Sequence, residues 1–445
     1  MRAALLLPLL ALDVYAQSGA RFRRLNERCP AGRSSRGLGC DGLAFEFEFA
    51  PASGSGMGAY CACTAITGAN GEAMTFTRSG TATCSRQGLA TTGIANGDLV
   101  TCATDQPRVE RLGGVPGLRV ESTRTNETPR SQEIDNAAWT NVATIVANPT
   151  LNAANAAVAP DGTTTAEDYT FPATAAGQQS IRLGATIPTV CNSVSCSHTI
   201  FVRGFSGVGT VDICSWDTGT PDCVGCAFTD TSWSRCSITV VNSGSVAVGV
   251  GNSTLWNGGA ARASNRVFVW GAQSEVGTHP TSYIPTVSAA VTRNEETVFR
   301  DETQFGELMG GAGGSVAATA QCLNTASRRI VTLATSGGST NVEWDVNFPS
   351  GAVAVTQWFT GATSTFTSTL AIESAIRRWA QFTSGAGSTL NICRDGVCQA
   401  GGSRGANQSG ATGLRIHVGN YVSGAFRCDG IVTGVCVSQS PSRCR

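Results

Sequence analysis

The chain has 445 residues, enough for two or three domains with hydrophobic cores of their own. Its formal net charge is zero, only 14% of its residues are charged, and it contains 53 glycines. This composition excludes the basic surface typical of nucleic-acid-binding proteins and the charge imbalance of a disordered tail. Every basic side chain is arginine, which also excludes mechanisms that need lysine, such as Schiff-base formation.

The N-terminus predicts export. Arg2 is followed by the apolar stretch AALLLPLLAL and by a small-residue site, VYA, that ends at Ala16. This pattern is typical of a signal peptide over residues 1–16. The apolar stretch is too short to cross a bilayer, which takes roughly twenty residues, and no later segment is long and apolar enough. The alternative is a virion protein assembled in the cytoplasm, whose N-terminus is merely apolar.

Eighteen cysteines support export, because cytosolic thiols are kept reduced. Six lie in residues 17–125, six in 126–298 and six in 299–445. Each segment can therefore close its own disulfides, although the connectivity within six cysteines stays open. We take these segments as the expected domains.

Residues 17–125 are expected to form a strand-rich leader. An arginine- and glycine-rich arm over 17–40 is followed by LAFEFEFA at 43–50, whose strict alternation predicts a half-buried strand. The stretches MTFTRSGTATC and DQPRVERLGGVPGLRVESTRTN come next, at 74–84 and 105–126.

Residues 126–298 contain strands anchored by aromatic residues and flanked by turn residues. The blocks that show this are EIDNAAWT, AAVAPDGTTTAEDYT, WSRCSITV and VFVWGAQSEVGTHPTSYIPTVSAAVTR. In this order they resemble a carbohydrate-binding-module-like β-sandwich found in phage tail-fibre and head-spike proteins and related bacterial surface proteins. Residues 75–83, 107–108 and 117–126 resemble the leader that precedes it there. The resemblance implies a recognition or scaffold module and argues against catalysis.

The chain departs from this pattern at one point. Residues 127–132 read ETPRSQ where the resembling proteins continue with apolar residues. We therefore expect the strand there to be shortened or exposed.

Residues 299–445 form a series of short alternating strands without intervening helices, which predicts an antiparallel sandwich. One strand is expected at 378–383. The segments NICRDGVC and FRCDGIVTGVCVS resemble parts of laminin-G/concanavalin-A-like domains. In CRDGVC, Asp395 and Gly396 predict a type I′ hairpin turn. Cys393 and Cys398 then face each other in a non-hydrogen-bonded pair, which suits a disulfide.

The predicted fold is therefore all-β and disulfide-bonded. It comprises two antiparallel β-sandwich (jelly-roll) domains, at 126–298 and 299–445, behind the leader at 17–125.

Candidate catalytic and metal-binding residues were weighed against structural roles. Glu343, Asp345 and Asn347 share one face of a strand, as the acidic residues of concanavalin-A-like glycoside hydrolases do. Because the third position is an asparagine, a retaining hydrolase would lack its proton donor. The polar face of a structural strand is the preferred interpretation.

The remaining candidates are weaker. Zinc ligation is conceivable at one cysteine cluster, but a single CxxC in an exported chain favours disulfides. Its members are Cys214, Cys223, Cys226 and Cys236. The histidines, which are His198, His279 and His417, have no motif around them. Glu275 is a possible calcium ligand without a supporting carboxylate run. We predict no cofactor and no metal.

Sugar binding requires exposed aromatic faces beside short polar groups. Trp216 and Trp256 lie in polar, glycine-rich stretches and are the predicted carbohydrate-binding residues, with packing beneath a loop as the alternative. The tryptophans in strand-like blocks are expected in the core. These are Trp139, Trp233 and Trp270.

The predicted function is non-enzymatic, extracellular recognition or adhesion, at a cell surface or on a virion. The expected partner is a glycan or cell-surface polysaccharide, and homo-oligomerisation is possible. The alternative is a structural fibre, virion or appendage component whose sandwiches act as spacers. A glycoside hydrolase is the third interpretation.

Overall fold

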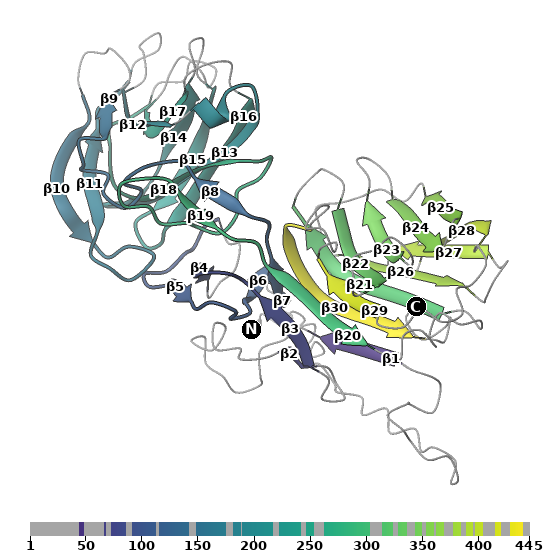
Figure 1. Ribbon diagram of the computed structural model, residues 1–445. Helices are drawn as coiled ribbons and strands as arrows, with labels where there is room; N and C mark the ends of the chain where they lie inside the picture. Colours follow the sequence, from purple (N-terminus) through teal and green to yellow (C-terminus); the bar gives the residue numbers. More distant parts are fainter. Residues whose placement is uncertain are drawn as a thin grey trace, which may run out of the picture.

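The computed structural model is all-β, as predicted from the sequence (Figure 1). Every strand pair is antiparallel, and the helical structure in the described part is a 3-10 turn at Thr189–Cys191. Within that part, no helix has the length and apolarity to cross a membrane. The described residues are 44–48, 66–67, 73–85, 91–112, 115–141, 148–174, 181–187, 189–216, 222–241, 246–252, 262–302, 314–323, 328–335, 343–348, 353–359, 362–368, 377–383, 389–394, 397–403, 414–419 and 428–438.

The central sandwich consists of two five-stranded sheets. The front sheet has the order β10(Thr150–Ala157), β11(Ala166–Phe171), β18(Asn265–Val276), β13(Ser195–Gly204), β16(Ser234–Val241). The back sheet has the order β15(Asp222–Thr229), β14(Val208–Trp216), β17(Val246–Asn252), β12(Ile181–Ile187), β9(Trp139–Asn141).

The two sheets enclose one apolar core. Along β13, Ile200 and Val202 point into it, and Val211 and Ile213 of β14 meet them from the back sheet. This alternation is what a strand with one buried face requires. The predicted core tryptophans are confirmed, because each is at most 5% exposed: Trp139, Trp233 and Trp270.

The C-terminal sandwich consists of two eight-stranded sheets. The first has the order β28(Val397–Ser403), β27(Thr389–Arg394), β26(Arg377–Thr383), β21(Gly314–Cys322), β30(Gly430–Ser438), β7(Val115–Val120), β6(Val109–Leu112), with β1(Ala44–Glu48) also on β30. The second has the order β2(Ile66–Thr67), β3(Ala73–Thr77), β20(Thr297–Glu302), β29(Leu414–Val418), β22(Arg328–Thr335), β23(Glu343–Phe348), β24(Val353–Phe359), β25(Ala362–Ser368). The strand expected at 378–383 is β26.

The strand pairing crosses the expected boundary between the leader and the later domains. Strands β1, β6 and β7 complete the first C-terminal sheet, and β2 and β3 pair into the second. The chain thus begins the C-terminal sandwich, leaves it for the central sandwich, and then returns. Strands β8(Arg124–Asn126) and β19(Val291–Arg293) pair with each other where the chain leaves and returns (Figure 1). The central sandwich is an insertion, which local sequence patterns cannot reveal because the pairing is between distant segments.

A second part of the expected leader belongs to the central sandwich. The ribbon β4(Ala82–Ser85) and β5(Leu99–Cys102), with residues 91–98 before β5, lies against the front sheet. Ile94 exchanges backbone hydrogen bonds with Trp233 at 3.1 and 2.8 Å. Ile94 and Leu99 are buried with Trp233 and Trp270 in a second apolar cluster outside the sandwich core.

Buried arginines and glutamates join the segments where the two sandwiches meet. This junction cluster comprises Arg78, Arg108, Arg119, Glu121, Arg293 and Glu296. Glu296 accepts from Arg78 at 2.7 Å and from both Nε and Nη2 of Arg108 at 2.6 Å. Glu121 accepts from Arg108 at 2.7 Å and also pairs with Arg119 and Arg293.

Most members of the junction cluster come from the leader segments 75–83, 107–108 and 117–126. These are the segments that resemble the leader of the phage-type proteins, and the cluster gives them a structural role. Burial alone raises the pKa of Glu121, but the charges of Arg119, Arg293 and Arg108 outweigh it and hold that pKa well below its usual range. Asp429 extends the contacts to β30, accepting from Ser122 N at 2.6 Å and Arg124 Nη2 at 3.0 Å.

The unusual segment 127–132 is partly as predicted. Strand β8 does end at Asn126, so the strand is shortened. The expectation of exposure is wrong for Thr128 and Ser131, which are fully buried. Thr128 Oγ1 donates to Ser274 Oγ at 2.7 Å, and Ser131 N donates to Thr286 Oγ1 at 3.0 Å. These hydrogen bonds compensate for the polar groups that replace apolar ones.

Six disulfides lie in the described part, and each joins cysteines of one expected segment. They are Cys84–Cys102, Cys191–Cys196, Cys214–Cys223, Cys226–Cys236, Cys322–Cys428 and Cys393–Cys398. Cys393 faces Cys398 and Arg394 faces Val397 across β27 and β28, with 4.0 Å between the cysteine Cα atoms. The predicted turn at 395–396, the signal peptide and the arm at 17–40 lie outside the described residues.

Candidate functional site

The outer face of the front sheet carries the side chains that could act on a ligand. Along β13, Thr199, Phe201 and Arg203 point to this face, because Ile200 and Val202 between them point into the core. Phe205 follows just after the strand. One end of this face is covered by residues 91–102, and the other end is open.

A β-bulge in β18 determines which of its side chains point to the covered end of the face. The register between β13 and β18 shifts between Thr199 and Phe201, opposite Gly271, whose φ is +65°. A Cβ at Gly271 would lie 2.9 Å from the Phe201 ring, so glycine is required there for both conformation and space. The bulge lets Trp270 point outward while Ala272 points into the core. The rings of Phe201 and Trp270 then meet at 5.5 Å between centroids, edge to face.

The open end carries two cross-strand rows of side chains. In the first row, Arg203 of β13 faces Phe268 of β18, which faces Asp168 of β11. In the second, Arg266 faces Thr170, and its backbone carbonyl accepts from Phe205 N at 3.0 Å. We call Arg203, Phe205, Arg266 and Phe268 the platform. Arginine and phenylalanine alternate along both strands, so rings and guanidinium groups lie side by side.

The two platform arginines have different electrostatic surroundings. The Arg203 guanidinium carbon lies 4.9 Å from the ring centroids of both Trp233 and Phe268. Its Nη1 donates to Asn96 Oδ1 at 3.0 Å, while its buried Nε has no hydrogen-bond partner. Burial lowers the pKa of Arg203. In the described part of the chain, no carboxylate forms an ion pair with it.

Arg266 is paired. It lies 3.6 Å from the centroid of Phe205 and donates to Asp168 through Nε at 3.0 Å and Nη2 at 2.6 Å. This hydrogen bonding raises the pKa of Arg266. Asp168 also accepts from Asn152 Nδ2 at 3.0 Å. The platform therefore offers a half-exposed Phe205 ring (45% exposed) and the partly exposed guanidinium group of Arg266, while the Asp168 carboxylate beneath them is buried.

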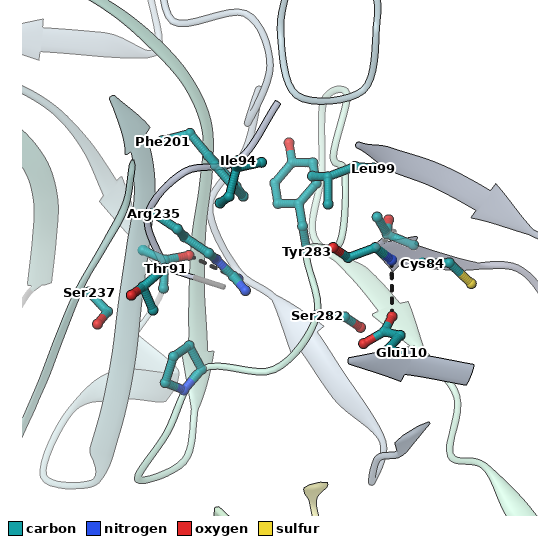
Figure 2. A pocket seen from close by; sticks show the side chains of 14 residues that line it. Cys84, Thr91, Ile94, Leu99, Glu110, Phe201, Arg235, Ser237, Ser282 and Tyr283 are labelled. Carbon is teal, nitrogen blue, oxygen red and sulfur yellow. Dashed lines mark hydrogen bonds between the residues drawn. The ribbon is translucent and has the colours of Figure 1, made fainter. Parts of the chain in front are cut away.

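A small pocket lies at the covered end, between the β4–β5 ribbon and the front sheet (Figure 2). Its volume is about 60 Å³. Arg235 of β16 lines one side, and Glu110 and Ser282 line the other. Glu110 accepts from Ser85 N at 3.0 Å, and burial raises its pKa. Ile94, Leu99, Phe201 and Tyr283 supply apolar walls.

One of the two tryptophans predicted to bind sugar lies in the other sheet of the central sandwich. Trp216 is the last residue of β14, opposite Ala247 of β17, and so lies in the back sheet, where a loop was expected. Trp256 lies outside the described residues. Their role as binding residues stays a prediction.

Four of the candidate catalytic residues lie on strands of the C-terminal sandwich, and a catalytic role for them is not tested by the described side chains. Glu343, Asp345 and Asn347 are on β23, with side chains outside the description. The same holds for His417 on β29.

His198 instead bridges the two layers of the central sandwich. It is fully buried, with Nδ1 3.0 Å from Ser274 Oγ and Nε2 3.2 Å from Ser215 Oγ. Burial lowers its pKa to about 4. His279 Nε2 lies 3.3 Å from Asp429 Oδ2 at the junction. Both are structural positions, and neither faces a nucleophile that a substrate could reach.

The cysteines considered for zinc form two disulfides, Cys214–Cys223 and Cys226–Cys236. Glu275 is fully buried and accepts from the backbone and hydroxyl groups of Thr281, so its carboxylate closes a loop. In the described residues, no group of three or more acidic, histidine or cysteine side chains is placed to hold a metal.

The sequence contained a signal for the platform that the motif analysis missed. In FVRGF (201–205) and NRVFVW (265–270), arginine and aromatic residues alternate with small or aliphatic ones at the period of a strand. The aromatic residues next to them are buried in the core, so the pattern alone does not distinguish an outward face from a buried one.

Comparison with known proteins does not assign the chain to a family. No protein-family model and no curated protein matches the chain. Among solved structures, the N-terminal CBM22-1–CBM22-2 tandem domain of Paenibacillus barcinonensis Xyn10C is similar with a TM-score of 0.25 and 9% identity, over 72% of this chain and 98% of that one. Domains LG4-5 of the mouse laminin α1 chain are similar with a TM-score of 0.20 and 10% identity, over 66% and 88%. At these values neither similarity bears on function.

Proposed function

We propose that the protein is a non-enzymatic, extracellular recognition protein that binds a glycan or cell-surface polysaccharide through the platform. The observation that carries the proposal is the pair of rows in which rings and guanidinium groups alternate on an open sheet face. Sugar rings stack on aromatic faces, and their hydroxyl groups need donors and acceptors held in fixed directions. Phe205 and Phe268 supply the rings, while Arg203 and the partly exposed Arg266 supply the donors.

The geometry favours binding because the platform is already ordered. Arg203 is held between two rings and by Asn96, so little side-chain freedom is lost when a ligand binds. Six disulfides in the described part support an oxidising, extracellular location.

The test is a glycan array on the purified, oxidised protein, followed by affinity measurements on the best ligand. Phe268→Ala and Phe205→Ala are each expected to weaken binding by about 1–2 kcal/mol, or ~5- to 30-fold. The matched control is Val241→Ala on the same sheet, whose side chain is 66% exposed and outside the platform. It should bind like the parent.

Two results would redirect the proposal. If Trp216→Ala or Trp256→Ala weakens binding while the platform variants do not, the ligand lies on the residues predicted from the sequence. If no polysaccharide binds, the alternative of a structural fibre or appendage component gains support.

A further inference from the structure

The pocket in Figure 2 is distinct from the platform, and its chemistry points to a different ligand. Its dominant polar group is Arg235. Nη1 donates to the Thr281 carbonyl at 2.8 Å, and Nη2 donates to Thr199 Oγ1 at 3.2 Å. The buried Nε has no partner. These neighbours are neutral, so the hydrogen bonds orient the guanidinium without neutralising it.

The charge of Arg235 is only partly balanced by the protein. Glu275 and Glu121 attract it, whereas Arg119 repels it, and no carboxylate in the described part forms an ion pair with it. The guanidinium carbon lies 5.5 Å from the Phe201 ring centroid. A buried cation without an anionic partner is costly, and an anion that enters the pocket removes that cost.

The rest of the lining limits the anion to a small organic one. The walls formed by Ile94, Leu99, Phe201 and Tyr283 favour carbon over a hydrated inorganic ion. A volume of about 60 Å³ holds only a few waters at roughly 10–15 Å³ each, which is the size of a carboxylate and a few further heavy atoms. Glu110, across from Arg235, can bind a hydroxyl group on that remainder.

We propose that this pocket binds a carboxylate group, with Arg235 as its charge partner. The carboxylate enters between Thr91 and Ser237, the two exposed residues of the lining. It belongs either to a free short-chain acid or to a uronic acid at the end of a longer chain. Fork-shaped guanidinium donors match the two oxygens of a carboxylate in both cases.

The experiment titrates the full-length oxidised protein, by ligand-observed NMR, with lactate, propionate and galacturonate. The neutral counterparts are propionamide and galactose. Carboxylates should bind at least about 10-fold more tightly than the neutral compounds, because the amide and alcohol lack the charge. Binding of lactate and propionate alone indicates a free short-chain acid, and binding of galacturonate indicates a uronic acid.

Variants locate the site. Arg235→Gln should lower carboxylate affinity at least about 10-fold. Because that residue also holds the loop at Thr281, Ser237→Phe provides a second test that blocks the mouth from an exposed strand position, with Ser237→Ala as its control. Phe205→Ala should leave carboxylate binding intact, which separates this pocket from the platform. Equal binding of neutral compounds, full binding by Ser237→Phe, or no carboxylate binding at all would overturn the proposal.

Discussion

Arginines at the junction and arginines on the platform show how one residue type serves two purposes. At the junction, Arg108 is fully buried and makes five hydrogen bonds, three of them to the carboxylates of Glu121 and Glu296. On the platform, Arg203 is half-buried between two rings, donates to a single amide oxygen, and has no carboxylate partner. Arg108 has no donor left for a ligand, whereas Arg203 lies on a sheet face that a ligand can reach.

The junction cluster also has a structural role. Burying several charges is costly, and their mutual attraction offsets that cost only when the complete set is in place. The cluster draws its members from before and after the inserted sandwich. It therefore holds together the segments where the chain leaves the C-terminal sandwich and returns, and we interpret its role as specifying that arrangement.

The largest expected effect is at the junction. Arg108→Gln removes one partner each from two fully buried carboxylates, and the shorter neutral amide cannot reach both. We expect the free energy of unfolding to fall by about 3–5 kcal/mol, measured by chemical denaturation. The control is Arg130→Gln, which breaks the partly exposed ion pair with Glu133 and should cost about 0–1 kcal/mol. Equal effects of the two variants would contradict the role given to the cluster.

The next prediction concerns His198, which is buried and titratable like the junction residues. In the described part its ring contacts hydroxyl groups and no charged group. Its pKa of about 4 in the folded protein lies below the unfolded value of about 6.5. Above pH 6.5 the ring is neutral in both states. As the pH falls from about 6.5 to about 4, the unfolded state binds a proton that the folded state does not, so the folded state loses stability. The loss should reach about 3 kcal/mol.

The measurement compares the parent with His198→Gln at several pH values. Burial raises the pKa of Glu167 to about 7, which acts in the opposite direction over the same range, so the comparison must be between variants. The difference in unfolding free energy between the two proteins should shrink as the pH is lowered. A difference independent of pH would mean that the ring titrates normally.

Much of the fold could be predicted because it depends on local patterns. Alternation gave the strands, Trp233 and Trp270 gave the core, and the CRDGVC sequence gave the register of β27 and β28. The insertion of the central sandwich could not be predicted, since the pairing of β1 with β30 joins residues almost a chain length apart. For the same reason the ion cluster was invisible, although its segments were recognised as motifs.

The binding face was missed for a different physical reason. Sequence alternation shows which residues share a face but not whether another segment covers it. Trp233 and Phe268 both belong to the outer face of the front sheet, yet the segment around Ile94 buries the first and leaves the second partly exposed. Only the packed structure separates the covered end from the open one.

The smallest expected effect on stability comes from the same substitution made on the platform. Arg203→Gln removes two cation–π contacts, each worth about 0.5–1 kcal/mol at such sites, but it also removes a partly desolvated charge without an anionic partner. The glutamine amide retains a donor for Asn96. We therefore expect the unfolding free energy to change by no more than about 1 kcal/mol, while binding of the array-selected glycan weakens at least about 5-fold. Denaturation and binding measured on one preparation test both parts. If Arg203→Gln destabilises the protein as much as Arg108→Gln and leaves glycan binding unchanged, the platform arginine is structural, and the distinction between the two sets of arginines fails.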